Sequence, residues 1–426
     1  MRLMTSHISK AVAVATAFFC FPTVGAASGD DNQEDTNSSW YHDAAAVPFA
    51  FSTDSMGLSI GLAGVVKGAG QPQASLLGAG LVTNKGTWMT YLGAYNFAPS
   101  EQGRWLLGTE LYSANYQDFD YFLGAGAGND SSADDAVIAD ANEAWYQLSA
   151  RYILPWGSAK QEPIKSALIP ARKITGHAPW NSGVSSIEFR PFYQSRQFEH
   201  SPSLPTTQFS TADSVWGLET RLDWDNQNNT RNPTEGSHTQ VKLTYDPGAS
   251  ERPSWWKWEL NQSWFWNLGQ WGDLFDQQVI AFNVYTADTP SWNNRESVSG
   301  QEQYQRPPEF AAVRLGGLYR LRSYQGGRFA GRSALSYSLE YRVMPEWQPL
   351  GGWPVFDWYD VPWWQWVAFV DAGRVADSYS LSTLHQDMKW SAGGAMRFQV
   401  EGVVVRAEMA WGQEESTFRV MVNQPF

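Results

Sequence analysis

The stretch Trp256-Lys-Trp-Glu-Leu-Asn-Gln-Ser-Trp-Phe-Trp-Asn267 decides the fold class of this 426-residue chain. Its even positions are apolar, apart from Gln262: Trp256, Trp258, Leu260, Trp264 and Trp266. Its odd positions are polar, apart from Phe265: Lys257, Glu259, Asn261, Ser263 and Asn267. Successive side chains of a β-strand point to opposite faces of the sheet. The stretch therefore predicts a strand with one aromatic face and one mostly polar face.

The same two-residue period recurs along much of the chain, for example in residues 216–224, 239–245 and 335–343. The apolar face is rich in Trp and Tyr, and charged residues lie mid-strand on the other face. Amphipathic rings favour the membrane–water boundary, and a water-filled interior tolerates charge. Within a bilayer every backbone hydrogen bond must be made internally, which a closed barrel achieves. The pattern predicts an all-β fold, a transmembrane antiparallel β-barrel. The alternative is a soluble sandwich with these rings in its core.

Segments of about ten residues, separated by turn residues, predict about sixteen strands, an even number that is usual for bacterial barrels. They are Gly57–Lys67, Ala74–Thr83, Thr87–Phe97, Arg104–Ala114, Asp118–Gly126, Glu143–Leu154, Val184–Ser195, Val215–Trp224, His238–Tyr245, Ser254–Trp266, Gln278–Tyr285, Ser333–Met344, Trp366–Gly373, Lys389–Phe398, Gly402–Trp411 and Thr417–Phe426.

Composition excludes several other classes. Aromatic residues make up 15% of the chain and charged residues 17%, whereas a disordered chain is poor in aromatics. Beyond the N-terminus there is no run near the ~18 apolar residues that a spanning helix needs. The formal net charge is −13, whereas a nucleic-acid-binding protein usually carries a basic surface.

The first 26 residues are predicted to be a signal peptide, with basic Arg2 and Lys10, an apolar stretch, and a small-residue cleavage site at Val24-Gly25-Ala26. Residues 27–56 are then expected to form a short periplasmic segment, and residues 57–426 the outer-membrane barrel. The single cysteine, Cys20, lies in the signal. The mature chain is therefore expected to have neither disulfides nor thiolate metal sites.

The residues that usually carry chemistry are sparse. The six histidines form no metal-binding pair, and no phosphate-binding loop occurs. Ser237 and His238 are adjacent in a predicted strand, so they point to opposite faces and cannot act as a lipase pair. We expect no enzyme, no catalytic residue, no metal site and no cofactor. The acidic run 129–135 could bind divalent cations, but a solvated loop is the favoured interpretation.

The predicted last strand carries apolar residues at one parity and ends in a terminal phenylalanine. Phe418 and Phe426 are therefore interpreted as the signal by which outer-membrane barrels are recognised for insertion. The alternative is an ordinary final strand.

Four segments resemble the bacterial surface antigen family, the BamA/TamA superfamily of outer-membrane barrels. The first is the family turn motif within residues 225–236, with Asp225, Asn232, Pro233, Thr234 and Gly236. The others are Leu315–Tyr324, which contains the tetrad Leu-Arg-Ser-Tyr, the glutamate strand Ser338–Arg342, and Phe369–Gly373, which has the family's Phe-x-Asp-x-Gly pattern. All four occur in the order typical of the family, and their joint match is specific.

The resemblance implies that the long loop before the twelfth strand folds into the lumen. Arg322 would then pair with Glu340 and Asp371 on the inner wall, and Ser323, Tyr324 and Gly373 would complete this loop clamp. The alternative places Arg322 on an exposed loop, with both carboxylates facing water.

Two residues depart from the motifs. Ser323 stands where the family has glycine, so close approach to the wall becomes harder unless the backbone avoids positive φ. Gln227 stands where the family usually has arginine, so we expect any ion pair made by the residue at that position to be missing.

The family's insertases carry polypeptide-transport-associated (POTRA) domains, for which residues 27–56 leave no room. The resemblance therefore implies a short member that helps to insert or translocate protein or lipid at the outer membrane. Its expected partners are outer-membrane lipids, an unidentified client and a periplasmic protein, but not nucleic acid. The alternatives are a passive channel and a surface-interaction barrel without client handling.

Overall fold

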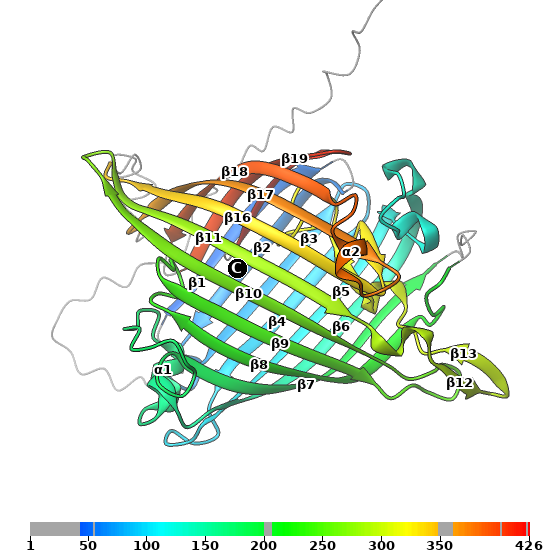
Figure 1. Cartoon of the computed structure of the whole chain (residues 1–426), viewed down its shortest axis with the longest axis horizontal. Helices are drawn as coiled ribbons and strands as arrows, with labels where there is room; N and C mark the ends of the chain where they lie inside the picture. The colour runs from blue at the N-terminus through cyan, green and yellow to red at the C-terminus, as the bar shows by residue number, and fades with distance from the viewer. Residues whose placement is uncertain (1–42, 54–55, 200–206, 348–360, 401–402, 423–424) are drawn as a thin grey trace, which may run out of the picture. The chain divides into compact units, whose positions relative to one another are not determined.

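The computed structural model describes residues 43–53, 56–199, 207–347, 361–400, 403–422 and 425–426. It contains one antiparallel sheet of sixteen strands, in which each strand pairs with its neighbour in sequence and β11 is followed by β16 (Figure 1). The strands are β1 (Asp43–Thr53), β2 (Gly57–Lys67), β3 (Ser75–Thr83), β4 (Trp88–Phe97), β5 (Trp105–Tyr121), β6 (Val137–Ile153), β7 (Val184–Phe198), β8 (Ser214–Gln227), β9 (Gly236–Asp246), β10 (Trp255–Trp271), β11 (Phe275–Asp288), β16 (Ser333–Pro345), β17 (Trp364–Ala376), β18 (Lys389–Val400), β19 (Val403–Gly412) and β20 (Ser416–Val422).

The predicted all-β class and the number of strands are confirmed. The number agrees because one strand was missed and another was predicted as two. The predicted start of the sheet at Gly57 is wrong, because β1 precedes it and pairs with β2 from Asp43 to Thr53. The predicted strands Arg104–Ala114 and Asp118–Gly126 are one strand, β5. Asp118 has a positive φ of 49°, so a local irregularity, and not a turn, explains the polar break in the pattern. The predicted signal peptide lies outside the described residues.

In the described residues, helical structure is limited to short segments. The α-helices are α1 (Pro163–Leu168), between β6 and β7, and α2 (Leu381–Leu384), between β17 and β18. Among the described residues, no helix has the length and apolar character needed to cross a bilayer. Figure 1 shows α2 and the hairpin β12–β13 (Arg295–Val298, Gln301–Tyr304) at one end of the strands and α1 at the other.

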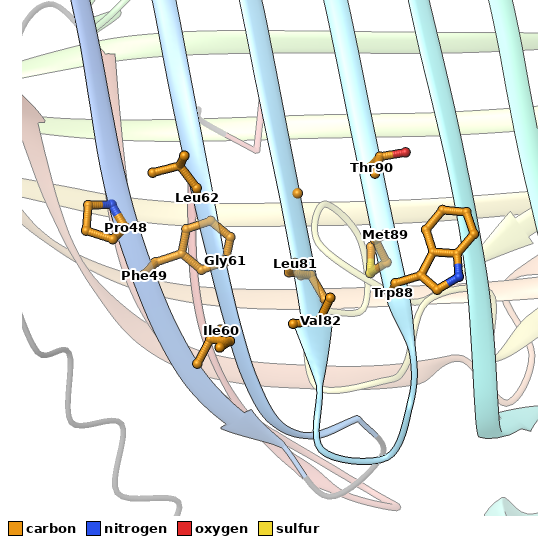
Figure 2. Close-up of a pocket in the computed structure, with 11 residues that line it drawn as sticks. Pro48, Phe49, Ile60, Gly61, Leu62, Leu81, Val82, Trp88, Met89 and Thr90 are labelled. Atoms are coloured by element: carbon orange, nitrogen blue, oxygen red, sulfur yellow. The ribbon is translucent and has the colours of Figure 1, made fainter.

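By its internal contacts the chain divides into two compact units. The described part of the first comprises residues up to Asp120, Ile138–Tyr152 and the stretch that begins at Arg190. In this unit the two-residue period is visible in the exposure of the side chains. Ile60 and Leu62 of β2 are each 56% exposed, whereas Ser59 is buried. These exposed side chains border a shallow apolar groove across β1–β4, where Gly80 contributes no side chain (Figure 2).

The described part of the second unit comprises Tyr121–Val137, Ile153–Phe189 and the described residues from Thr207 to Phe426. In β10, Trp264 and Trp266 are exposed, whereas Phe265 between them is 3% exposed. In β17, Trp366 and Val370 are exposed, and Phe369 and Asp371 are buried. One face of this unit is therefore aromatic and apolar, as predicted. We call the opposite face, which carries the long loop, the inner face.

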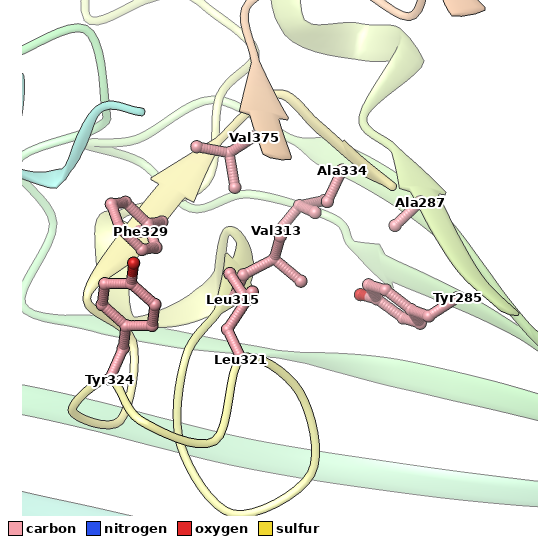
Figure 3. Packing of buried hydrophobic residues seen from close by; sticks show 9 residues of the cluster. All are labelled: Tyr285, Ala287, Val313, Leu315, Leu321, Tyr324, Phe329, Ala334 and Val375. Atoms are coloured by element: carbon pink, nitrogen blue, oxygen red, sulfur yellow. The ribbon is translucent and has the colours of Figure 1, made fainter. Parts of the chain in front are cut away.

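The long loop (residues 289–332) connects β11 to β16, the twelfth strand of the sheet. It contains the hairpin β12–β13 and the short pair β14 (Val313–Leu315) and β15 (Phe329–Gly331). A buried cluster joins its apolar side chains to those of β11, β16 and β17 (Figure 3): Tyr285, Ala287, Val313, Leu315, Leu321, Tyr324, Phe329, Ala334 and Val375. The predicted in-folding of this loop is confirmed, because its apolar residues are packed against the inner face.

Candidate functional site

Arg322 of the long loop forms the centre of a buried charge cluster. Its side chain is fully buried and forms a two-pronged pair with Asp371 of β17: Nε lies 2.9 Å from Oδ2, and Nη2 lies 2.8 Å from Oδ1. The backbone N–H of Arg322 donates to the same carboxylate over 3.0 Å. Such bidentate, charge-assisted bonds fix the orientation of both partners.

Two glutamates engage the remaining nitrogen of the guanidinium. Nη1 of Arg322 lies 2.6 Å from Oε1 of Glu340 on β16 and 3.3 Å from Oε2 of Glu408 on β19. The arginine therefore binds carboxylates from three strands of the inner face. The predicted pairing with Glu340 and Asp371 is present in the structure, and Glu408 is a third partner that was not predicted.

Phe369 of β17 completes the surroundings of the guanidinium. The Cζ of Arg322 lies 3.5 Å from the centre of the Phe369 ring, and that ring is almost fully buried. An aromatic face attracts a cation and excludes water. The strand alternation alone left this phenylalanine as an unexplained apolar side chain on a polar face, and the stacking with Arg322 explains it.

Further arginines surround the glutamates. Nη2 of Arg397 lies 2.8 Å from Oε1 of Glu340, Nε of Arg342 lies 2.8 Å from Oε2 of the same side chain, and Arg406 lies 3.6 Å from Glu408. These residues share the inner-face parity of their strands, which the sequence shows, but their partners depend on the register of β16–β19. Four arginines thus face three carboxylates. Removing one partner of such a buried network costs about 3–5 kcal/mol.

The loop backbone is held by β20 as well. Thr417 donates to the carbonyl oxygen of Arg322 over 2.9 Å. Arg419 donates to three loop carbonyls, those of Gly317, Arg322 and Tyr324, over 2.7–3.0 Å. Residues 317–324 are therefore fixed through both their side chains and their main chain.

Ser323, the departure from the family tetrad, fits because its surroundings compensate. It is fully buried and faces Gly412 of β19, where an added Cβ would lie 2.1 Å from the serine Oγ. The positive φ values of this segment belong to Gly316, Gly317 and Leu321, and not to Ser323. A serine is thus accommodated without backbone strain by a glycine on the opposing strand.

Tyr324 and Gly373 lie in the same assembly. The Tyr324 ring packs at a steep angle against Phe329, with centroids 5.1 Å apart, and its hydroxyl lies 3.4 Å from Oε1 of Gln413. A Cβ at Gly373 would lie 3.1 Å from Leu315 of the loop. The structure therefore brings together Arg322, Ser323, Tyr324, Glu340, Asp371 and Gly373, the six residues of the predicted loop clamp.

The turn motif forms a separate site at the end of β8. Gln227 is uncharged, and a different residue of the turn, Asp225, forms an ion pair with Arg172 over 2.9 Å. This arginine comes from the long connection between β6 and β7, so no local sequence signal indicated it. The motif glycine, Gly236, has a φ of 98°, and a Cβ there would lie 2.0 Å from the carbonyl oxygen of Asn226.

The other motif residues build the turn itself. The side chain of Asn228 accepts from the backbone of Thr234 over 3.0 Å and donates to its hydroxyl over 2.6 Å. Pro233 lies within the same turn, and Asn232 donates to Gln277 of β11 over 3.1 Å. The turn motif therefore joins three segments, but it is not part of the loop clamp.

Phe418 and the C-terminal Phe426 do not share a face. Phe418 is exposed, as its strand position predicts. β20 ends at Val422, and Phe426 packs against the buried side chains of Phe265, Val279 and Ala281. The prediction of one continuous parity to the terminus is therefore wrong, because the regular strand stops before Phe426. The proposed role of both residues in insertion stays a prediction.

Other candidate chemistry is weak. In the parts of the chain that the structure describes, no three His, Cys, Asp or Glu side chains are grouped so as to hold a metal. His238 lies 2.9 Å from Asp223 on the polar face of β8 and β9. Ser131 of the acidic run binds Arg328. What the geometry supports is an immobilised loop.

A sixteen-stranded antiparallel sheet with a loop held to its inner face by a buried arginine defines a class of outer-membrane β-barrel. Residues 186–426 match the Omp85 superfamily domain. The chain belongs to the Omp85 superfamily, whose members are outer-membrane barrels of Gram-negative bacteria.

Solved structures with a similar fold include CdiB from Escherichia coli and CdiB from Acinetobacter baumannii. The first aligns with a TM-score of 0.52 at 9% identity, covering 89% of this chain and 60% of that chain. The second gives 0.50 at 10% identity, with 89% and 59% covered. This chain therefore spans about 60% of the length of each. No curated protein sequence matches it.

Proposed function

We propose that this protein assists the insertion or translocation of protein or lipid at the outer membrane, and that the long loop closes its lumen at rest. The observation that carries the proposal is the buried contact of Arg322 with Asp371, Glu340 and Glu408. A loop held by charge on three strands and by backbone contacts to β20 is a fixed obstruction on the inner face.

The clamp also implies two states of the loop, one bound to the inner face and one displaced from it, which differ by the contacts of Arg322. Moving residues 317–324 away from the wall would leave Glu340, Asp371 and Glu408 without the guanidinium that joins them. This cost opposes spontaneous opening, so a client or a partner that binds the displaced loop would have to offset it. The proposal therefore requires an external trigger, for which a periplasmic protein and the surrounding lipids are candidates.

The test is complementation of a deletion strain. Outer-membrane protein and lipid composition should change on deletion and be restored by the wild-type chain. An Arg322→Ala variant that reaches the membrane at normal levels should not restore it. Arg332→Ala, on the same loop with its side chain bound to Asp288, is the matched control. An unchanged composition on deletion would exclude the proposal in favour of a surface-interaction barrel. Full rescue by Arg322→Ala would exclude a role for the clamp.

Purification from native membranes, followed by identification of the co-isolated proteins and lipids, would supply the client and the partner.

A further inference from the structure

A second buried arginine, Arg328, lies in the long loop just before β15, and every donor of its guanidinium is used. Nε and Nη2 donate to the two carboxylate oxygens of Glu414 over 2.8 and 2.9 Å. Nη1 donates to the carbonyl oxygen of Gly126 over 3.1 Å and to Oγ of Ser131 over 2.8 Å. Nη2 also donates to the carbonyl oxygen of Ser131 over 3.0 Å. The side chain is fully buried, with its Cζ 4.3 Å from the ring centre of Phe122.

These partners come from connections between strands, unlike the partners of Arg322. Gly126 and Ser131 lie in residues 122–136, the connection between β5 and β6, which we call the cap loop. Glu414 lies in the turn between β19 and β20. Arg328 therefore joins three segments that are far apart in sequence, and it does so at the ends of strands, whereas Arg322 binds near their middle.

Other contacts hold the cap loop in the same position. The backbone N–H of Gly124 donates to Oε1 of Glu309 in the long loop over 2.6 Å. The side chain of Asn129 donates to the carbonyl oxygen of Asp387, in the connection after α2, over 3.1 Å. The cap loop is thus attached to the long loop at two points and to a neighbouring connection at a third.

We propose that Arg328 is a latch that closes one end of the lumen by joining the cap loop, the long loop and the β19–β20 turn. The inference rests on the proposed function in one respect: passage of a client through the lumen would require both this latch and the Arg322 clamp to open, whereas the loss of either contact alone would let ions through. Arg322 acts near the middle of the strands and Arg328 at their ends, so each arginine holds a different part of the obstruction.

The chemistry suits a latch that opens as a unit. A planar guanidinium with five bonds cannot be replaced by lysine, which carries three donors at one point. Breaking the contact leaves Glu414 and the Ser131 carbonyl without their hydrogen-bond donor at the same time. A partly opened latch would therefore lose the hydrogen bonds without freeing the cap loop. Arg332, whose side chain is 19% exposed and bound to Asp288, offers a matched comparison on the same loop.

The test uses the full-length protein in lipid nanodiscs, with hydrogen exchange measured for residues 122–136 and for residues 317–324. Arg328→Ala should raise the exchange rate of the cap loop at least tenfold and leave residues 317–324 protected. Arg328→Lys should give an intermediate rate, and Arg332→Ala should match the wild type. Glu414→Gln, which keeps the arginine, provides a second variant should Arg328→Ala fail to fold.

Planar-bilayer recordings complete the test. Arg328→Ala should show brief openings that the wild type lacks, with Arg322 intact. An unchanged exchange rate of the cap loop in both Arg328→Ala and Glu414→Gln would overturn the latch, as would an equal increase in Arg332→Ala. Neither readout needs a client, so failure of the latch and failure of the proposed function remain distinguishable.

Discussion

At the residue scale, the clamp depends on side chains whose sizes match across the loop and the sheet. Ser323 occupies space that Gly412 leaves open, and Leu315 occupies space beside Gly373. Protein interiors are packed too densely to accept an extra carbon at such contacts without movement. The sequence showed that Ser323 departs from the family tetrad, but its compensating glycine lies on a distant strand.

This pairing gives the first prediction. Gly412→Ala should displace the loop and lower the free energy of unfolding by about 1–3 kcal/mol, the usual cost of overpacking. Ser323→Gly alone should have a small effect, and the double variant should recover part of the loss. Urea unfolding in a lipid environment gives the free energy of unfolding of the wild type, the two single variants and the double variant. A strictly additive double variant would show that the two residues do not interact.

The second prediction concerns Glu340, whose carboxylate contacts Arg322, Arg342 and Arg397. Glu340→Gln should lower the free energy of unfolding by about 3–5 kcal/mol, because three buried guanidinium groups lose their shared counter-charge. Glu188→Gln, which removes a partly exposed carboxylate 3.4 Å from Arg221, should cost less than about 1 kcal/mol. Equal losses in the two variants would contradict the assignment of Glu340 as the centre of the network.

At the element scale, most strands could be predicted because one face is aromatic and the other polar. The alternation indicates β10, β16 and β17 directly. It fails for β1, where alanines and Pro48 hide the period, and for β5, where the irregular backbone at Asp118 resembles a turn. Pro48 is tolerated there because β1 stands at one end of the strand order.

The hairpin β12–β13 gives a prediction of pH dependence. Oε2 of Glu296 accepts from Ser254 twice, over 2.7 and 2.9 Å, and from Gln305 over 2.9 Å. The hydrogen bonds from Gln305 and then from Ser254 lower the pKa of this carboxyl below its ordinary value. A carboxyl with a lowered folded-state pKa stabilises above its unfolded pKa, and the contribution is lost as the pH falls through the folded value.

The hairpin should therefore be held at neutral pH and released in acid. Hydrogen exchange of residues 295–304, corrected for the intrinsic rate, should increase once the pH falls below about 4. Glu296→Gln should show the faster exchange already at pH 7, and Glu302→Gln on the same hairpin should behave as the wild type. Protection that is independent of pH in the wild type would contradict this role of Glu296.

At the scale of the whole molecule, the chain is an Omp85 superfamily barrel whose long loop is fastened to the inner face. The fold class, the position of the loop and the Arg322 contacts with Glu340 and Asp371 could be predicted, because alternation and the family motifs constrain them. Glu408, Phe369, Arg328 and the Arg172 contact to Asp225 could not. Each depends on strand register or on connections that bring distant residues together.

The central claim is that Arg322 keeps the loop in place and thereby closes the lumen. Single-channel conductance of the purified protein in planar bilayers tests it most directly. The wild type and Arg332→Ala should be mostly closed, whereas Arg322→Ala should give frequent, large openings. Steady large currents in the wild type that Arg322→Ala leaves unchanged would contradict the claim and indicate a passive channel.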